Sequence, residues 1–313
     1  MTTAPIGAAS DPTAGRSAHP GSARESRERI RWWRVLPAAT FHAGCLGVIW
    51  FGWSPVAVAA AAALYLVRMF AITGFYHRYF SHRTFRTSRP VQFLFAWIGA
   101  SSAQRGPIWW AAHHREHHRH SDEPTDIHSP RHKGLLWSHM GWFFTDAGMA
   151  TRSEGVPDLL RYPELRWLER WHILAPLSLA AAMFGLGAWL GPAWGTSGAQ
   201  MLAWFCVSTT LVHHATFTIN SISHVVGRRR YDTGDDSRNS LALAILTLGE
   251  GWHNNHHFHP GSTRQGFFWW EIDMAYYTLW LMSKVGLVWD LRAPSTRVYD
   301  SPARLDRRSK RAA

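Results

Sequence analysis

Histidine is the residue whose spacing in this sequence suggests chemistry. The 313-residue chain has 20 histidines, and several of them recur in short groups. Two groups share the spacing H-x-x-H-H: His114, His117, His118 and His253, His256, His257. Because positions i, i+3 and i+4 lie on one face of a helix, each group would present three imidazoles in one direction. Imidazole is a ligand for iron, zinc and copper, so each group predicts part of a metal site.

Two further groups lie beside apolar segments. His77 and His82 are five residues apart, which is not one face of an α-helix, so we expect the helix to end or bend between them, where Gly74 and Ser81 favour a break. Asn220 and His224 form an i, i+4 pair. The four groups together offer more histidines than the four ligands that one zinc ion takes, which favours two metal ions. Ligand type alone leaves iron, zinc and copper open.

Each histidine also has a simpler interpretation. A single histidine on a helix is usually solvated or hydrogen-bonded to a neighbour, and the repeated spacing is what argues against this for the four groups. For the remaining histidines we expect structural roles. His213 and His214 are the exceptions that most suggest function, because they lie within an apolar segment.

Long apolar segments must position these groups. The chain has no Asp, Glu, Lys or Arg in residues 35–67 or in residues 171–227. Turn residues at Gly52 to Pro55 and at Gly191-Pro192 divide each run into two. The sequence therefore predicts four membrane spans, at residues 35–53, 55–76, 172–190 and 199–220. The alternative, a buried helical core of a soluble protein, fits poorly with two charge-free runs of this length.

Charge predicts the orientation of these spans. The net charge is +12, and nearly all Lys and Arg lie in the N-terminal tail, in residues 68–170 and in the C-terminal segment. The positive-inside rule places those three parts, including both termini and the histidine groups, in the cytoplasm. The 19 tryptophans favour a membrane interface, so the positive charge requires no nucleic-acid partner.

The predicted fold is an all-α, multi-pass integral membrane protein with four transmembrane helices under a cytoplasmic helical cap. Residues 1–30 are expected to be a disordered basic tail, because they lack hydrophobic periodicity. Residues 31–292 form the membrane domain, and residues 293–313 a polar basic tail. The cap would hold the histidine-rich site with two metals.

The histidine groups resemble those of membrane fatty acyl desaturases, most closely the bacterial form of the stearoyl-CoA (Δ9) type. The resemblance runs from about residue 40 to residue 292. The segments that carry it are His77 to His82, Ser138-His-Met-Gly-Trp142, Asn220 to His224 and Gly249 to His257. Related hydroxylases and ketolases share such groups. The Asn220 and His224 pair, and the Glu250-Gly251-Trp252 segment directly before His253, favour a desaturase.

The resemblance implies a di-iron site and an oxygen-dependent reaction. Asn220 would hold a water on one iron, and nine histidines would be ligands: His77, His82, His114, His117, His118, His224, His253, His256 and His257. The enzyme would use dioxygen to introduce a cis double bond, at Δ9, into a saturated acyl chain. A separate donor, such as a ferredoxin or a b-type cytochrome with its reductase, would supply electrons. Membrane lipids would surround the protein.

Two other functions stay open. One is a hydroxylase or ketolase that acts on a lipid, alkane or carotenoid at the same metals. The other is a non-catalytic membrane protein that binds haem or transports metal. Haem ligation would require paired histidines inside the spans, whereas most of the histidine groups lie outside them.

The acyl carrier is also open. The animal acyl-CoA enzymes have an Arg-Asp pair before the second histidine group, where this chain has Ala112-His113. They also have a basic pair after the Gly-Trp segment, where this chain has Phe144 to Ala147. The carrier can be CoA, acyl carrier protein or a lipid. Arg105, Trp110 and Trp142 are the predicted substrate contacts. Arg131 and Lys133 are further candidates for gripping CoA, and Trp109, Phe143 and Phe217 for lining an acyl tunnel.

Ligand imidazoles are usually oriented by carboxylates that accept from the second ring nitrogen. The candidates, chosen by their proximity in sequence, are Glu116, Asp122, Asp126 and Glu250.

Overall fold

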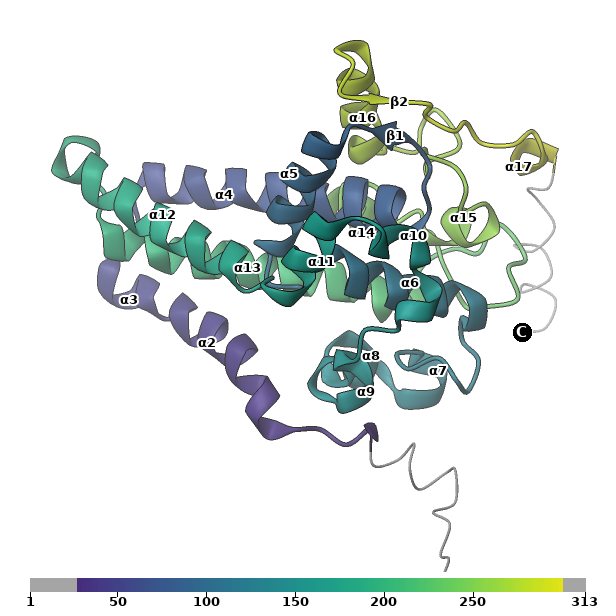
Figure 1. Cartoon of the computed structure of the whole chain (residues 1–313), viewed down its shortest axis with the longest axis horizontal. Helices are drawn as coiled ribbons and strands as arrows, with labels where there is room; N and C mark the ends of the chain where they lie inside the picture. The colour runs from purple at the N-terminus through teal and green to yellow at the C-terminus, as the bar shows by residue number, and fades with distance from the viewer. Residues whose placement is uncertain (1–26, 301–313) are drawn as a thin grey trace, which may run out of the picture.

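The computed structural model describes residues 27–300 (Figure 1). Long apolar helices form an elongated bundle at one side, and shorter helices form a cap at the other (Figure 1). We use "cap" for residues 82–170 and 221–300. The first 26 residues of the predicted N-terminal tail, and residues 301–313 of the predicted C-terminal tail, lie outside the described residues.

The bundle is built from two helical hairpins. Its elements are η1 (Trp32–Val35), α2 (Leu36–Cys45), α3 (Gly47–Phe51), α4 (Pro55–Phe70), η2 (Ala71–Ser81), α12 (Leu174–Leu190), η5 (Gly191–Trp194) and α13 (Gly198–Asn220). Ser54 and Ser197 begin the second helix of each hairpin, since their hydroxyls accept from the backbone N–H of Ala57 and Gln200. Pro55 occupies the first helical position of α4, where its missing N–H costs nothing.

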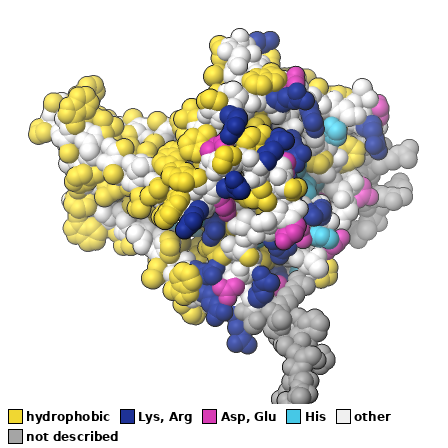
Figure 2. Space-filling model, in the orientation of Figure 1, with side chains coloured by type: hydrophobic (Ala, Val, Ile, Leu, Met, Phe, Trp, Pro, Cys, Tyr) yellow, Lys and Arg dark blue, Asp and Glu magenta, His cyan; other side chains and the backbone are white. Residues whose placement is uncertain are grey.

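Three segments are long and apolar enough to cross a membrane: Trp32–Phe51, Pro55–Ser81 and Leu174–Trp194. Apolar side chains cover the bundle, whereas Lys and Arg gather on the cap (Figure 2). Helix α13 is 23 residues long, but polar side chains such as Gln200 and His214 interrupt its apolar sequence. It packs against α2, α4 and α12. Its role as the fourth span therefore stays a prediction.

The cap contains many short helices and one β ribbon. Its helices are α5 (Arg89–Ala100), α6 (Pro107–His120), α7 (Pro130–Lys133), α8 (Leu135–His139), η3 (Gly141–Phe144), α9 (Asp146–Met149), η4 (Ser153–Gly155), α10 (Pro157–Leu160), α11 (Pro163–Arg170), η6 (Ile222–His224), α14 (Leu241–Leu246), α15 (His253–Phe258), α16 (Met274–Lys284) and α17 (Arg297–Asp300). Strands β1 (Arg86–Thr87) and β2 (Val288–Trp289) pair antiparallel. The packed structure continues past residue 292, since Val298 in α17 is buried and its carbonyl accepts from Tyr231.

The helix that leads into the cap ends at Ser81, between His77 and His82, as the spacing of this pair predicted. The predicted span ended near residue 76, and the helix continues past that point to Ser81 as the π-helix η2. The His82 N–H donates to the carbonyl of His77, 3.2 Å away, which is the i to i+5 pattern of π-winding. Wider winding places residues five apart on the same face, so His77 and His82 converge without a bend.

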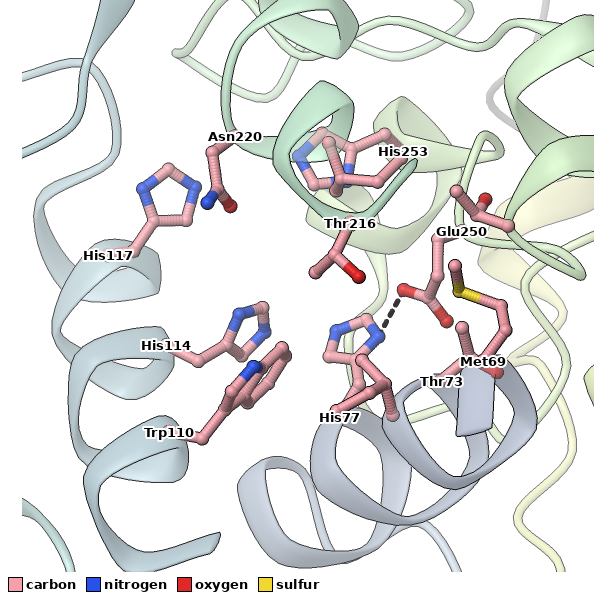
Figure 3. Close-up of a pocket in the computed structure, with 13 residues that line it drawn as sticks. Met69, Thr73, His77, Trp110, His114, His117, Thr216, Asn220, Glu250 and His253 are labelled. Carbon is pink, nitrogen blue, oxygen red and sulfur yellow. Dashed lines mark ion pairs between the residues drawn. The ribbon is translucent and has the colours of Figure 1, made fainter. Parts of the chain in front are cut away.

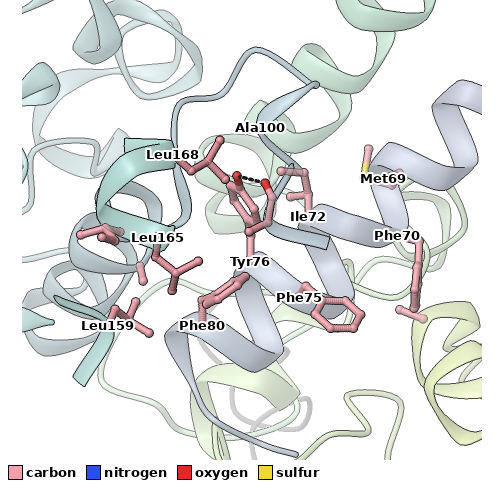
Figure 4. Packing of buried hydrophobic residues seen from close by; sticks show 14 of the residues in the cluster. Met69, Phe70, Ile72, Phe75, Tyr76, Phe80, Ala100, Leu159, Leu165 and Leu168 are labelled. Carbon is pink, nitrogen blue, oxygen red and sulfur yellow. Dashed lines mark hydrogen bonds between the residues drawn. The ribbon is translucent and has the colours of Figure 1, made fainter. Parts of the chain in front are cut away.

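The main hydrophobic core surrounds η2 (Figure 4). Phe75 stacks on Phe95 of α5 with ring centroids 3.9 Å apart, and the Tyr76 hydroxyl donates to the Ala96 carbonyl. Phe80 and Leu165 are also fully buried in this cluster. The π-helix is therefore held on its outer side by packed aromatic and aliphatic side chains, which leaves its other side free for the histidines.

A buried arginine lies within the second apolar segment. Arg68 is 1% exposed, and its guanidinium donates to Thr209 Oγ1 and Ser208 Oγ, each 2.7 Å away. It also lies over the Phe205 ring. Within residues 27–300 no carboxylate forms an ion pair with it. Two hydroxyls of α13, two backbone carbonyls (Leu64 and Ser101) and one ring thus replace water around this charge, and the hydroxyls join α4 to α13.

We expect Thr209→Val to lower the free energy of unfolding by about 1.5–3 kcal/mol, because it removes an oxygen that accepts from a charged donor. In an Arg68→Met background the same substitution should cost much less, since no charge is left unpaired. Denaturation of the four proteins in detergent measures both values. Equal costs in the two backgrounds would contradict this account of Arg68.

Candidate metal centre

All nine histidines expected as ligands converge in two clusters. The first contains five histidines: His77, His82, His114, His118 and His256. The second contains four: His117, His224, His253 and His257. Within each cluster the candidate ligand atoms lie within 4.8 Å of one another. Two separate clusters of this kind suit two metal ions.

Three types of local structure deliver these rings. The π-helix η2 supplies His77, and His82 follows directly after its end. Helices α6 and α15 each supply one H-x-x-H-H group on one face, as predicted. The last ring, His224, lies in the 3-10 turn η6, just after α13 ends at Asn220. Each cluster draws on elements far apart in sequence, so it forms only when bundle and cap are assembled.

Buried carboxylates orient several of the rings. The Nδ1 of His117 lies 2.9 Å from Asp126 Oδ2, and that of His224 lies 2.8 Å from Asp122 Oδ2. His77 Nδ1 forms a close ion pair with Glu250 (Figure 3). These three acids were among the four candidates for orienting ligands, and their contacts match that role. A carboxylate that accepts from Nδ1–H fixes the tautomer and leaves Nε2 as the ligand atom.

Two orienting residues were missed by sequence reasoning. Asp235 Oδ2 lies 2.6 Å from His257 Nδ1, and nothing in the irregular 225–240 loop marks it. Gln265 Nε2 lies 3.3 Å from His77 Nδ1 and 3.4 Å from His256 Nδ1. Both residues reach the site through loop conformation, which no periodic pattern encodes.

The fourth candidate acid, Glu116, does not contact a ligand ring and has the alternative, structural role. Its carboxylate pairs instead with Arg119 and Arg152, at 2.9 and 3.0 Å. Glu116 lies between His114 and His117 in the sequence, but on a helix adjacent residues point about 100° apart, so its side chain turns to the cap surface. Proximity in sequence therefore does not by itself identify an orienting acid.

The arrangement of ring nitrogens in both clusters suits a bound cation. In the four-histidine cluster, carboxylates occupy the Nδ1 atoms of His117, His224 and His257, so three Nε2 lone pairs converge in a buried space. The Nε2 of His257 has no hydrogen-bond partner among the described residues. In the five-histidine cluster, the Nε2 atoms of His82 and His114 approach to 2.7 Å. Converging lone pairs repel one another unless a cation lies between them.

Burial keeps most of these rings neutral. It lowers the pKa of His114, His118, His253 and His256 well below the usual value, and neighbouring imidazoles lower it further. Burial also lowers the pKa of His257, to about 4, although Asp235 opposes this shift. Burial would also lower the pKa of His117, but Asp126 outweighs it and raises the value. Metal ligation requires unprotonated nitrogen, so the neutral rings are ready to bind.

The orienting acids are ionised. Burial alone would raise the pKa of Asp122, Asp126 and Asp235, but hydrogen bonds and the charge of neighbouring histidines hold each pKa well below its usual range. Together with Glu250, whose pKa is also lowered despite burial, they place negative charge around the two clusters. That charge favours bound cations.

His128 is a further imidazole at the site. It was assigned a structural role, but it is buried and forms a group with His117 and Asp126. Its backbone N–H donates to Asp126 Oδ1, and its ring stacks on Trp142 with centroids 5.0 Å apart. It thereby fixes the carboxylate that orients His117.

Three cavities lie in series beside the clusters. The first, about 180 Å³, is lined by Arg105, Phe143 and Phe217 among others. The second, about 30 Å³, shares Gln104 and Phe143 with the first. The third, also about 30 Å³, shares Trp110, His114, Thr216 and Asn220 with the second (Figure 3). Because neighbouring cavities share lining residues, the three form a row beside the histidine clusters, and we call this row the path.

The predicted substrate contacts all lie along this path. Arg105 lines the first cavity, Trp142 the second, and Trp110 the second and third. Arg131 and Lys133, the other basic candidates, lie elsewhere on the cap and pair with Asp236 and Glu28. His213, which suggested function from its place in a span, lines the first cavity and contacts the Ser102 carbonyl.

Apolar helices and imidazole clusters together define a membrane-associated protein with a histidine-rich metal-binding centre. A model of the fatty acid desaturase family matches residues 51–292, and the chain belongs to this family. It is thus an oxidoreductase of lipid metabolism.

Its relatives differ in acyl carrier. It is 36% identical to the palmitoyl-monogalactosyldiacylglycerol delta-7 desaturase of Arabidopsis thaliana, over 87% of this chain and 74% of that protein. It is 35% identical to the sn-2 palmitoyl-lipid 9-desaturase of Nostoc sp. (strain 36), over 84% and 91%. It is 33% identical to the acyl-CoA C20 Delta5-desaturase of Anemone leveillei, over 87% and 88%.

We expect Asp235→Asn to lower metal affinity by about 10- to 100-fold, because the amide no longer holds the His257 tautomer and ring orientation. Asp232→Asn is the matched control, since that side chain is 77% exposed and approaches only Arg229, at 3.7 Å. Metal retained per chain after equilibration with a graded chelator series measures the difference. Equal retention in the two variants would remove Asp235 from the site.

Proposed function

We propose that this enzyme holds two iron ions and uses dioxygen to introduce a cis double bond, at or near Δ9, into a saturated acyl chain. The observation that carries the proposal is the pair of imidazole clusters beside this row of cavities. Nine converging histidines suit two metals, with Asn220 placed in the wall of the second and third cavities to hold a water near the second cluster. Iron, when bound, supplies the oxidising power for attack on an unactivated methylene.

The path suits an acyl chain whose middle carbons react. Arg105 lies two residues before α6 begins, and His114 lies seven residues after its first residue, Pro107, so the helix between them accounts for roughly 10 Å. Several methylene groups fit between the first cavity and the metal ligands. Beyond the ligands, Met69 and Ile72 offer an apolar end for the methyl terminus. The relatives include Δ9, Δ7 and Δ5 enzymes, and this depth supports a mid-chain position.

The protein residues position the chain and exclude water. The Gln104 amide donates to Thr216 Oγ1 at 3.1 Å, where the first two cavities meet the third. The Trp110 ring stacks on His114 with centroids 5.0 Å apart. These contacts form part of the walls around the reacting carbons, together with the imidazoles of His77 and His114 and the Asn220 amide.

We infer a multi-pass topology with four spans, with α13 as the fourth, and with both termini and the metal centre on the cytoplasmic side. The concentration of Lys and Arg on the cap supports this orientation. A separate electron donor, a ferredoxin or a b-type cytochrome with its reductase, would dock on the cap.

A hydroxylase or ketolase on the same metals is the second candidate. The shared clusters permit it, because the metal site does not by itself determine whether oxygen is inserted. The desaturase names of the relatives favour the first candidate, and the products separate the two.

We expect cells that express the intact chain, together with a suitable donor, to contain a new monoene with its double bond near carbon 9. His117→Ala should abolish it, because that ring lies in one cluster and is held by Asp126. His120→Ala is the control, since His120 is on the same helix but contacts only Glu116 and Glu123 at the surface. Gas chromatography–mass spectrometry of derivatised fatty acids locates the bond.

A hydroxylated product in place of the monoene would move the assignment to the second candidate. Full activity of His117→Ala would contradict the metal-site assignment.

A further inference from the structure

The first cavity has an unusual distribution of charge. Its lining is mainly apolar, yet it includes two guanidinium groups, Arg34 and Arg105, and no carboxylate. An acyl chain requires only the apolar part of this lining. The arginines therefore call for a negative group in the same cavity, close to the end of the chain.

Arg105 has few partners of its own. Within residues 27–300 its side chain makes one hydrogen bond, to the sulfur of Met149, which is a weak acceptor. Its Nε is buried without a partner, and its guanidinium lies over the Trp109 ring. No carboxylate of the described residues forms an ion pair with Arg105, and the nearby acid Glu169 accepts from the Trp109 N–H and from Thr151. Arg105 also has a φ of +67°, a backbone conformation that costs energy in a residue with a Cβ.

Arg34 adds to this positive charge. Its Nη2 lies 2.6 Å from Asp146, but Arg31 shares the same carboxylate at 2.6 Å, so two guanidiniums face one acid. The Nε of Arg34 is buried without a partner in the described part of the chain. The region around the mouth of the first cavity therefore retains net positive charge after its own ion pairs are counted.

The mouth opens beside the ends of two apolar segments. Pro37 of α2 and Ile173, just before α12, both line the cavity and are exposed. These positions belong to or adjoin the segments Trp32–Phe51 and Leu174–Trp194. Exposed tryptophans lie next to both: Trp33 is 66% exposed and Trp171 44%. Tryptophan and arginine together are typical of the headgroup level of a bilayer, so the cavity meets the membrane where lipid phosphates lie.

We propose that the acyl substrate is a membrane phospholipid, and that Arg105, with Arg34, binds its phosphate while the acyl chain enters the first cavity from the bilayer. This rests on the proposed desaturase function. In a phospholipid the phosphate is joined to the acyl ester through the glycerol unit, so both fit one cavity mouth. In acyl-CoA and acyl carrier protein the nearest phosphate lies at the far end of the pantetheine arm, and a galactolipid has none.

The test measures lipid binding by full-length protein in detergent, which is independent of turnover. The probes are dipalmitoyl phosphatidylglycerol, monogalactosyldiacylglycerol with the same acyl chains, and palmitoyl-CoA, each titrated by native mass spectrometry. The variants are Arg105→Gln, Arg105→Lys and the control Arg86→Gln, whose side chain is 75% exposed and pairs with Asp290 at the surface. Gln at 105 keeps the backbone cost of the positive φ and removes only the charge.

We expect the wild type to bind the phospholipid more tightly than the galactolipid. Arg105→Gln should weaken phospholipid binding by roughly ten- to a hundredfold, the loss typical of a charge-assisted hydrogen bond, and leave galactolipid binding unchanged. Arg105→Lys should restore part of the affinity, and Arg86→Gln should bind like the wild type.

Equal binding of the two lipids by the wild type, or an unchanged affinity in Arg105→Gln, would overturn the proposal. Arg105-dependent binding of palmitoyl-CoA in preference to the phospholipid would also overturn it. Failure of the proposed function would appear elsewhere, as the absence of a monoene from every acyl class supplied to the iron-loaded enzyme with its donor.

Discussion

The structure depends on one constraint: nine imidazoles must be brought together neutral, with their Nε2 atoms converging, in a place that water does not reach. Neutral rings tolerate burial, whereas charged ones do not. The required tautomer is fixed from behind by Asp122, Asp126 and Asp235, and each of these acids is stabilised as an anion by the histidine it orients. Ligand and acid therefore depend on one another.

The elements of the fold can be understood as meeting that constraint. The π-winding of η2 places His77 and His82 on one face, and its aromatic outer side holds this rare geometry in the core. A second layer of buried charge supports the first. Arg78 donates to Asp273 and to Glu250, the acid that contacts His77, and Asn255 of α15 donates to Glu271. Most of these deeply buried polar groups have partners, as burial requires; the Nε of Arg78 has none among the described residues.

Much of this was predictable from sequence, because the informative signals are local. Two H-x-x-H-H groups predicted helical ligand faces, and the charge-free runs predicted the hairpins. What could not be predicted depends on long-range packing or loop shape. The helix end between His77 and His82 was predicted, but the π-winding that precedes it was not, because it depends on core packing. Asp235 and His128 act from irregular segments, and Glu116 faces away from the rings that flank it. The three-cavity path joins residues from the bundle and the cap, which no linear pattern connects.

The most direct test of the central claim is the metal itself. Full-length protein purified from iron-supplied cells should contain about two iron ions per chain, a stoichiometry inferred from the number of converging imidazoles. X-ray absorption at the iron edge should show coordination dominated by nitrogen. A single metal ion per chain, or zinc in place of iron, would contradict the two-cluster account.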